Sequence, residues 1–444
     1  MSKPRLYRGM RDFLPHQAIA RERVLDTIKE VFKLWGYVPI ETPAIELLDT
    51  LLGKYGGEAD KLIYRLDHPD QLGLRYDLTV PLARFFAQHR HELPKPFRRY
   101  QIQSVWRAER AQKQKGRFRE FVQCDVDIVG SDSPLADAEI LAITIETLTA
   151  LGFSDFKVLL NHRKILFGLV RQAGFSENEE LSVLRSVDKW DKVGLDGVVE
   201  ELTGKGFERA NVEKLISILN TDDDGRSLLE VFASSEDESI SYGARNLLRI
   251  LDILSMMGDY QRYIEFTPRM ARGLDYYTGA IFETVLESLP NMGSITGGGR
   301  FDDLIGMFVG ERIPACGTTV GLDRILAAME ELGLMPKAKT QAVVMVALFS
   351  EEYASAAIKL AQEFRKANIP AEMFIEPKKL GKQFEYANKW GIPYVALVGE
   401  DEAKSGLCVI KDMSTGEQFK LKPEEAVKFI KNRLTERESD KAGR

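Results

Sequence analysis

Residues 99–130 of the chain read RYQIQSVWRAERAQKQKGRFREFVQCDVDIVG, and this stretch decides the fold that we expect. Its two ends, 99–109 and 118–130, are rich in β-branched and aromatic residues, and a polar, basic loop joins them, which predicts a β-hairpin. Successive side chains of a strand point to opposite faces. One face of the second strand is therefore largely apolar, and the other carries Arg119, Phe121, Gln123, Asp125 and Asp127.

The charged face of this hairpin has two interpretations. Polar faces of antiparallel sheets often contact only water. Arginines beside acidic residues can instead hold a zwitterionic, phosphate-bearing ligand, because arginine binds phosphate through a planar set of donors. On the first strand Arg107 and Glu109 share a face, and residues 89–120 contain ten Lys or Arg against three Glu, a charge of +7 in a chain of net charge −6. We favour the ligand-binding interpretation.

The composition is that of a soluble globular protein. The chain has 444 residues, of which 44% are hydrophobic and 29% charged, and a chain of this length usually forms two or three domains. No apolar run approaches the roughly 18 residues of a membrane helix, and no apolar segment follows the polar N-terminus as in a signal peptide. We therefore expect a cytoplasmic protein that does not contact a membrane.

The spacing of cysteine and histidine argues against a metal site. The three cysteines lie far apart, which argues against a disulfide framework and a zinc site and fits a reducing cytoplasm. Among the five histidines only His89 and His91 are close, and they stand among arginines, a poor place for a metal cation. We expect no metal ion held by protein ligands.

The rest of the sequence divides into a core with a helical insertion and a smaller C-terminal domain. Helical periodicity dominates from about 176 to 262, and strands are predicted on both sides of this stretch. After residue 342 strands and helices alternate, which predicts a small α/β domain around a largely parallel sheet. We therefore predict domains at 1–331 and 342–444, with a linker at 332–341.

Two local assignments within the core concern segments near the polar hairpin face. Residues 74–80 have the composition of a strand, and residues 81–89 that of a short helix with Pro81 in its first turn. Residues 317–331 are predicted as a helix that a glycine-rich segment leads.

Three further segments combine glycine with charged or aromatic residues. Residues 272–279 read RGLDYYTG, residues 297–303 read GGGRFDD and residues 317–324 read GTTVGLDR. Consecutive glycines allow another group to approach the backbone closely, and tyrosine combines an apolar ring with a hydroxyl group. Each segment also has an ordinary structural explanation, such as surface tyrosines or close packing of a helix start.

Taken together and in this order, these segments resemble the class II aminoacyl-tRNA synthetases and specifically the histidyl-tRNA synthetase family. Residues 272–277 and 298–302 resemble the two histidine signatures of the family, and the first of these is the specific one. The looser matches are 37–43 to motif 1, 107–127 to motif 2, 317–324 to motif 3, 8–12 to the N-terminal start of the family and 342–430 to its anticodon-binding domain.

The resemblance implies an α+β fold, with a class II antiparallel-sheet catalytic core and a helical insertion, followed by a small α/β anticodon-binding domain. It implies a ligase that activates L-histidine with ATP to histidyl-adenylate and pyrophosphate, and then transfers histidine to the 3′ end of its tRNA. ATP would be a substrate that brings Mg²⁺ with it. The implied partners are L-histidine, ATP, tRNA(His) and a second copy of the chain in a homodimer with motif 1 at the interface.

The resemblance also implies roles for individual residues. Arg107 and Arg272 would be catalytic, acting on the α-phosphate, where charge builds as the histidine carboxylate attacks. The residues implied for histidine binding are Asp77, Leu78, Thr79, Arg107, Gln123, Asp127, Arg272, Tyr276 and Tyr277. The residues implied for ATP binding are Arg107, Glu109, Arg117, Phe121 and Arg324.

Two alternatives and two departures stand beside this interpretation. A catalytically silent, histidine-sensing relative, the regulatory subunit of ATP phosphoribosyltransferase, resembles the core but lacks the C-terminal domain. A prolyl, threonyl or glycyl enzyme of class II would lack the histidine signatures. Phe301 and Asp303 stand where the family commonly has Tyr and Gly, so one hydroxyl group near the pocket is missing.

Overall fold

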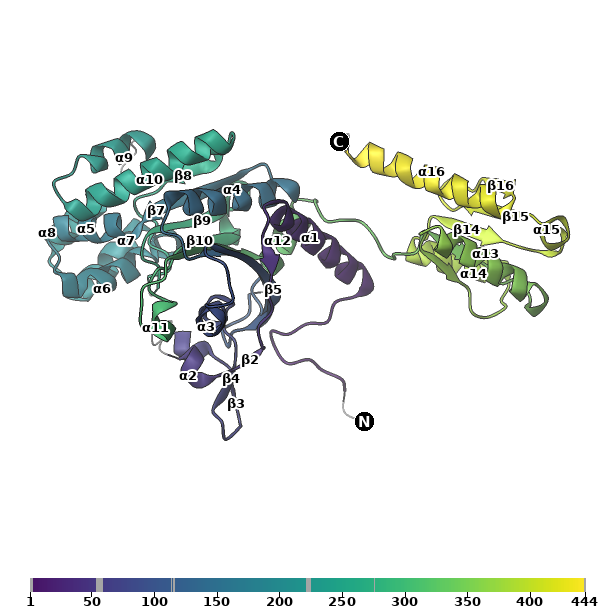
Figure 1. Cartoon of the computed structure of the whole chain (residues 1–444), viewed down its shortest axis with the longest axis horizontal. Coiled ribbons are helices and arrows are strands. Elements are labelled where there is room, and N and C mark those ends of the chain that lie inside the picture. Colours follow the sequence, from purple (N-terminus) through teal and green to yellow (C-terminus); the bar gives the residue numbers. More distant parts are fainter. Residues whose placement is uncertain are drawn as a thin grey trace. The chain divides into compact units, whose positions relative to one another are not determined.

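The computed structural model describes residues 3–52, 59–112, 114, 116–220, 225–274 and 276–442 (Figure 1). Asp275 of the first signature segment, and Lys113 and Lys115 of the basic loop, lie outside the described residues. The chain forms two compact units, one from 1–11 and 24–335 and the other from 12–23 and 336–444. The domain limits drawn from the sequence stay predictions.

The first unit is built on a curved eight-stranded sheet with the order β1-β5-β6-β11-β10-β9-β7-β8 (Figure 1). From β5 to β7 in this order each strand pairs antiparallel with its neighbour, whereas the edge strands β1 and β8 pair parallel. The predicted antiparallel core and its β5–β6 hairpin are therefore confirmed. The strands are β1 (Val38–Pro39), β5 (Phe97–Trp106), β6 (Glu120–Val129), β7 (Phe156–His162), β8 (Ile264–Phe266), β9 (Ala280–Leu286), β10 (Thr296–Arg300) and β11 (Ala315–Gly321).

One face of this sheet forms the main hydrophobic core. Val126 and Ile128 of β6 are buried in this core, together with side chains of several helices, three of them apart from the helix group that follows β7. Asp125 and Asp127 alternate with these apolar residues and so point to the opposite face. The sequence pattern of β6 therefore sorts its side chains as predicted. These three helices are α1 (Pro15–Leu34, from Val24 onward), α4 (Pro134–Ala150) and α12 (Leu322–Glu331).

The opposite side of the sheet carries a smaller layer with its own core around Phe86, Phe97 and Phe301. It contains a three-stranded sheet with the order β2-β4-β3. The elements of this layer are β2 (Ile45–Leu47), β3 (Arg65–Leu66), β4 (Leu72–Leu74), α2 (Leu48–Leu51), η1 (Ala59–Leu62), α3 (Thr79–His89) and α11 (Gly306–Val309).

Two of the local assignments made from the sequence are wrong in part. The strand predicted over 74–80 ends at Leu74, because the carboxylate of Asp77 accepts the backbone N–H groups of Thr79 and Val80 at 3.1 Å and starts α3 at Thr79. The helix predicted over 317–331 begins only at Leu322. Its glycine-rich start is the strand β11, which pairs with β6 on one side and β10 on the other, and this pairing outweighs the low strand propensity of glycine.

A group of helices follows β7 and gathers beside β7 and β8 at one end of the unit (Figure 1). Residues 177–220 and 225–257 of this group are almost wholly helical, as the periodicity predicts. The helices are α5 (Arg163–Gln172), α6 (Glu177–Val187), α7 (Trp190–Gly204), α8 (Arg209–Leu219), α9 (Gly225–Ala233) and α10 (Glu238–Met257), and the short 3₁₀ turns η3 (Gln261–Tyr263) and η4 (Pro290–Met292) lie beyond them.

The second unit has a five-stranded sheet with the order β13-β12-β14-β15-β16. Strands β13, β12 and β14 are parallel and β15 and β16 antiparallel, which confirms the predicted α/β character. Alternate residues of β12 enter two separate cores, so helices cover both faces. The elements are β12 (Val344–Val346), η5 (Glu351–Tyr353), α13 (Ala354–Lys366), β13 (Ala371–Met373), α14 (Leu380–Trp390), β14 (Tyr394–Leu397), α15 (Glu400–Ser405), β15 (Cys408–Asp412), β16 (Gln418–Leu421) and α16 (Pro423–Ala442).

A helix can cross a bilayer only if it is both long enough and apolar enough. In the part of the chain that the structure describes, none of the helices combines the length and the apolar character needed to cross a membrane.

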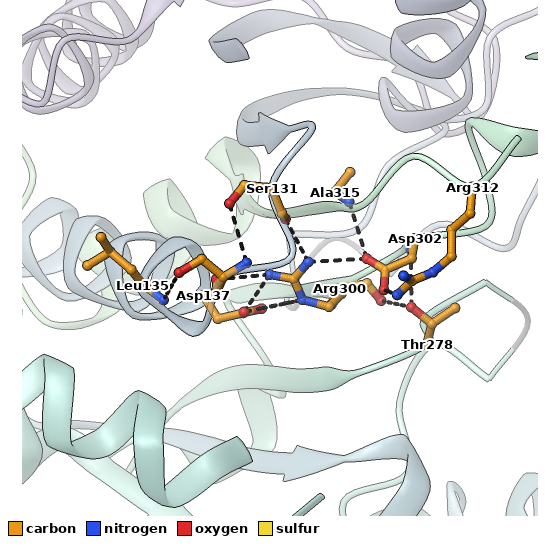
Figure 2. A network of polar contacts seen from close by, with 9 residues as sticks. Ser131, Leu135, Asp137, Thr278, Arg300, Asp302, Arg312 and Ala315 are labelled. Carbon is orange, nitrogen blue, oxygen red and sulfur yellow. Dashed lines mark hydrogen bonds and ion pairs between the residues drawn. The ribbon is translucent and has the colours of Figure 1, made fainter. Parts of the chain in front are cut away.

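A buried ion-pair network ties β10 to the start of α4 (Figure 2). The guanidinium of Arg300, 7% exposed, contacts the carboxylate of Asp137 in the first turn of α4 at 2.5 Å and that of Asp302 at 3.2 Å. Asp302 also pairs with Arg312 and accepts the backbone N–H of Ala315 at 3.3 Å. The network therefore joins three segments that are distant in sequence.

Asp137→Ala should lower the free energy of unfolding of the first unit by about 3 kcal/mol, because it leaves the buried Arg300 with one carboxylate fewer. Urea unfolding followed by circular dichroism measures this change. Glu213→Ala is the control, since the Arg209–Glu213 pair is solvent-exposed and contributes little. Equal midpoints for the two variants would contradict the structural role of the network.

Candidate active site

The polar face of the sheet opens into a cavity of about 370 Å³. Its walls come from β6, β10 and β11, from the start of α3, and from the segment 272–277. Leu78 is fully buried and is not among the lining residues. All the other site residues expected from the sequence line this one cavity: Asp77, Thr79, Arg107, Glu109, Arg117, Phe121, Gln123, Asp127, Arg272, Tyr276, Tyr277 and Arg324.

The floor of the cavity is acidic and buried. Asp125 and Asp127 are 2% and 3% exposed, so this polar face does not simply meet water. Arg99 of β5 stands opposite Asp127 in the strand register, and its Nη2 lies 2.8 Å from Oδ2 of Asp127. Arg99 is itself fully buried, so it can serve as a fixed countercharge beneath the floor.

Burial and neighbouring charges shift the pKa values of the carboxylates of the floor. Burial raises the pKa of Asp127, and the charge of Arg99 opposes that rise. Burial likewise raises the pKa of Asp125, against the effects of Arg99 and the Thr319 hydroxyl group. Asp77 adds a third negative charge close enough to act on both. Three carboxylates against one buried guanidinium favour a ligand that brings positive charge or N–H donors to the floor.

Sterics explain why two positions of the cavity wall are glycine. A Cβ atom on Gly317 would lie 1.9 Å from Oδ1 of Asp127, and one on Gly297 would lie 2.8 Å from the guanidinium carbon of Arg272. Such separations are far below van der Waals contact. The glycine-rich segments, which were weak signals in the sequence, therefore leave space for two charged side chains of the site.

Two tyrosines form one wall. The rings of Tyr276 and Tyr277 lie 4.4 Å apart, and the ring of Phe301 meets Tyr276 edge-on at 6.4 Å. Burial raises the pKa of Tyr276 well above its ordinary value and that of Tyr277 to about 12. Both hydroxyl groups therefore stay protonated at neutral pH and can donate or accept hydrogen bonds in the cavity.

The opposite end of the cavity is basic. Burial, together with the charges of Arg117 and Arg272, lowers the pKa of Arg324 to about 10. Arg272 pairs with Glu283 and donates to the hydroxyl group of Ser294. Three guanidinium groups that repel one another are the arrangement expected for a site that binds a polyanion.

Arg107 lies between aromatic rings that hold it in the cavity wall. Its Nε donates to the backbone oxygen of Tyr76 at 3.1 Å. The guanidinium carbon lies 4.2 Å from the ring centre of Tyr76 and 5.1 Å from that of Phe121. These contacts leave the rest of the guanidinium group available to a ligand, with cation–π attraction to both rings.

Sequence reasoning missed several residues of this site. Asp125 was placed on the right face but given no role, and Arg99 was not considered, because its position opposite Asp127 depends on strand register. Thr319 and Asp323 stood within a quoted segment, yet nothing in the sequence showed that they line the cavity. In the second signature only Phe301 reaches the cavity, whereas Arg300 and Asp302 belong to the ion-pair network (Figure 2).

In the described ranges no group of three or more His, Cys, Asp or Glu is arranged to hold a metal ion. Cys124, Cys316 and Cys408 are all buried.

The chain is similar to known proteins over nearly its whole length. A family model described as histidyl-tRNA synthetase matches residues 9–325, and one described as an anticodon binding domain matches residues 341–433. A histidine--tRNA ligase of Gloeobacter violaceus is 41% identical, covering 96% of this chain and 98% of its own length. A histidine--tRNA ligase of Clostridium tetani is 38% identical, covering 97% and 98%.

Solved structures of the same type share the fold. The crystal structure of a histidyl-tRNA synthetase from a Nostoc species superposes with a TM-score of 0.87 at 32% identity, covering 98% of this chain and 100% of that one. A Bacillus halodurans structure, described as an ATP phosphoribosyltransferase regulatory subunit/histidyl-tRNA synthetase, gives a TM-score of 0.73 at 24% identity and covers 87% of this chain and 97% of its own. At that identity the likeness shows a common fold alone.

Arg324→Met should weaken the binding of ATP by about tenfold to a hundredfold, because it removes charge-assisted hydrogen bonds to phosphate at the basic end. Isothermal titration calorimetry with ATP measures the change. Arg209→Met is the matched control, since Arg209 is exposed on α8 and pairs with the exposed Glu213. Unchanged ATP affinity in Arg324→Met would remove the basic end from the nucleotide site.

Proposed function

The chain belongs to the histidyl-tRNA synthetase family, and from this premise we propose that the single cavity described above binds histidine and ATP next to each other and joins them. The enzyme is a histidine--tRNA ligase: it activates L-histidine with ATP to histidyl-adenylate and pyrophosphate, and transfers histidine to the 3′ end of its tRNA. One observation carries the assignment of the site: the cavity has an acidic, buried floor at one end and three mutually repelling arginines at the other.

The acidic end is our proposed histidine site. Asp77 and Thr79 at the start of α3, together with Gln123, would hold the α-ammonium group. Asp127, with Tyr276 and Tyr277, would bind the imidazole nitrogens. Burial raises the pKa of Asp127 to about 6 against the opposing charge of Arg99, so above that pH its carboxylate can accept an imidazole N–H group. This end therefore offers acceptors for both nitrogen-bearing groups of the substrate.

The basic end is our proposed ATP site. Arg107 and Arg272 would contact the α-phosphate, and their charge would stabilise the transition state as the carboxylate of histidine attacks phosphorus and pyrophosphate leaves. Glu109, Arg117, Phe121 and Arg324 would hold the rest of the nucleotide. The reaction needs positioning and charge stabilisation more than proton transfer, and a cavity walled by fixed arginines supplies both.

A magnesium ion would accompany the nucleotide. Mg²⁺ bound to the ATP phosphates would neutralise charge on the leaving pyrophosphate. Glu109 lines the basic end and offers a carboxylate oxygen, the ligand type that Mg²⁺ prefers.

A histidine-sensing relative without catalysis has less support. Such a protein, like the regulatory subunit of ATP phosphoribosyltransferase, needs only the acidic end of the cavity. In such a protein Arg117, Arg272 and Arg324 at the other end would have no polyanion to bind, although the charges of Arg117 and Arg272 lower the pKa of Arg324.

The assembly and the second unit extend the proposal. We propose a cytoplasmic homodimer that uses the edge near β1 and β2, where Val38, Ile45 and Leu47 are exposed. We also propose that residues 342–444 read the anticodon, with 332–341 as a linker from a catalytic core at 1–331. The α/β unit with its own two cores supports an independent binding module.

Purified enzyme with ATP and Mg²⁺ should exchange pyrophosphate into ATP in the presence of histidine, and not with proline, threonine or glycine. The reason is that, of these four amino acids, only histidine supplies a second nitrogen-bearing group for the acidic floor. An exchange assay with all twenty amino acids checks this. Tight histidine binding without any exchange would favour the sensing relative instead.

Arg272→Ala and Asp127→Ala should lose activity in different ways. Arg272→Ala should lower the rate of adenylate formation by more than about a hundredfold and weaken histidine binding much less, because the charge that Arg272 meets develops in the transition state. Asp127→Ala should mainly weaken histidine binding. Single-turnover kinetics at several histidine concentrations separate the two effects, and the same pattern in both variants would refute this division of roles.

A further inference from the structure

The amide of Gln123 has a defined orientation in the floor of the cavity. Its Nε2 donates to Oγ1 of Thr319 at 2.9 Å, and Thr319 donates its hydroxyl proton to Oδ1 of Asp125. Nε2 also lies 3.4 Å from the same carboxylate oxygen. The three residues therefore form a relay of hydrogen bonds that runs from the amide through the hydroxyl group to the carboxylate.

The chemistry of these groups allows the relay only one direction while Asp125 is ionised. A carboxylate has no proton to give, and a hydroxyl group has one. Thr319 spends its proton on Asp125, so toward Gln123 it can only accept, and the amide must present its NH₂ group to it. A flipped amide would set its oxygen against two acceptors. Burial raises the pKa of Asp125 to about 7, although Arg99 and the Thr319 hydroxyl oppose that rise, so the ionised form that sets this direction prevails above about pH 7.

The consequence is an acceptor without a donor. Oε1 of Gln123 is buried and has no hydrogen-bond partner within the described part of the chain, although Gln123 is only 5% exposed. An unpaired buried acceptor is destabilising, so its retention in a cavity wall points to a ligand that brings the donor. Asp77 lines the same cavity, and its charge acts on Asp125.

We propose that Asp125 and Thr319 are positioning residues that lock the amide of Gln123 with its oxygen toward the substrate, and so make this part of the floor specific for an ammonium group. The proposal rests on the assignment of the cavity as the histidine site. Neither residue needs to touch histidine. Their effect is to exclude the amide orientation that would place an NH₂ group against the substrate's own N–H donors.

The test uses the full-length enzyme and two ligands, of which only one carries the ammonium group. Histidinol keeps the ammonium and imidazole groups of histidine but lacks its carboxylate, whereas imidazole-4-propionate keeps the carboxylate and lacks the ammonium group. Thr319→Val removes the hydroxyl group with little change of shape and frees the amide to rotate. It should weaken histidinol binding about tenfold, the scale of one hydrogen bond to a charged group, and leave imidazole-4-propionate within about twofold. Titration calorimetry measures both affinities.

Two further variants sharpen the outcome. Thr319→Ser restores the hydroxyl group and should restore histidinol binding. Asp125→Asn offers an NH₂ group that can reverse the relay, so it should weaken histidinol selectively, and in pyrophosphate exchange the KM for histidine should rise while kcat changes by less than about threefold. Equal losses for both ligands would mean a merely structural role and overturn the proposal, as would no loss at all. Wild-type enzyme that binds neither histidine nor histidinol would instead overturn the histidine site itself.

Discussion

A fully buried guanidinium on one strand faces a carboxylate on the next, and the architecture of the site depends on this contact between Arg99 and Asp127. Burying a carboxylate without a partner is costly, because the interior cannot replace its hydration. With Arg99 beneath it, a sheet face that would otherwise need water or apolar residues can carry buried acids in the floor of the cavity. The positive charge of Arg99 also acts on Asp125, the residue at which the relay from Gln123 ends.

The cavity is polarised along its length, and this polarity matches the chemistry of its proposed reaction. Nitrogen-bearing groups of an amino acid favour the acidic floor, and phosphates favour the arginine end, so the two substrates would meet where their reacting groups lie between the poles. Fixed charges in a site shielded from water act more strongly than the same charges in solvent. Clustering arginines at one end has an electrostatic cost at Arg324, because burial and the charges of Arg117 and Arg272 all lower its pKa.

Much of the fold and of the site could be predicted from local sequence patterns, and the failures share a cause. Alternation along 120–129 placed Asp125 and Asp127 on one face because the period of a strand is local information. The roles of Arg99 and Thr319 depend on which strands are neighbours and in what register, which no local pattern shows. For the same reason the segment at 317–321 was assigned to a helix: pairing on both sides makes it a central strand.

The start of α3 shows the limit of composition as a guide. The composition of residues 74–80 favours a strand. One carboxylate that accepts two backbone N–H groups is nevertheless enough to begin a helix there. That carboxylate belongs to Asp77, a lining residue of the cavity, so the helix cap and the binding site share one side chain. The sequence alone does not show that one residue both caps a helix and lines a binding site, because the second role depends on the fold.

The two wall glycines set a boundary for anyone who wishes to redesign this enzyme for another amino acid. Substrate specificity is usually altered by exchanging side chains, yet at Gly297 and Gly317 even a methyl group would displace Arg272 or Asp127. A substitution at either position would therefore move a charged side chain of the site. A library aimed at new substrates is better spent on Tyr276 and Phe301, where ring edges can be reshaped while the charged groups keep their places.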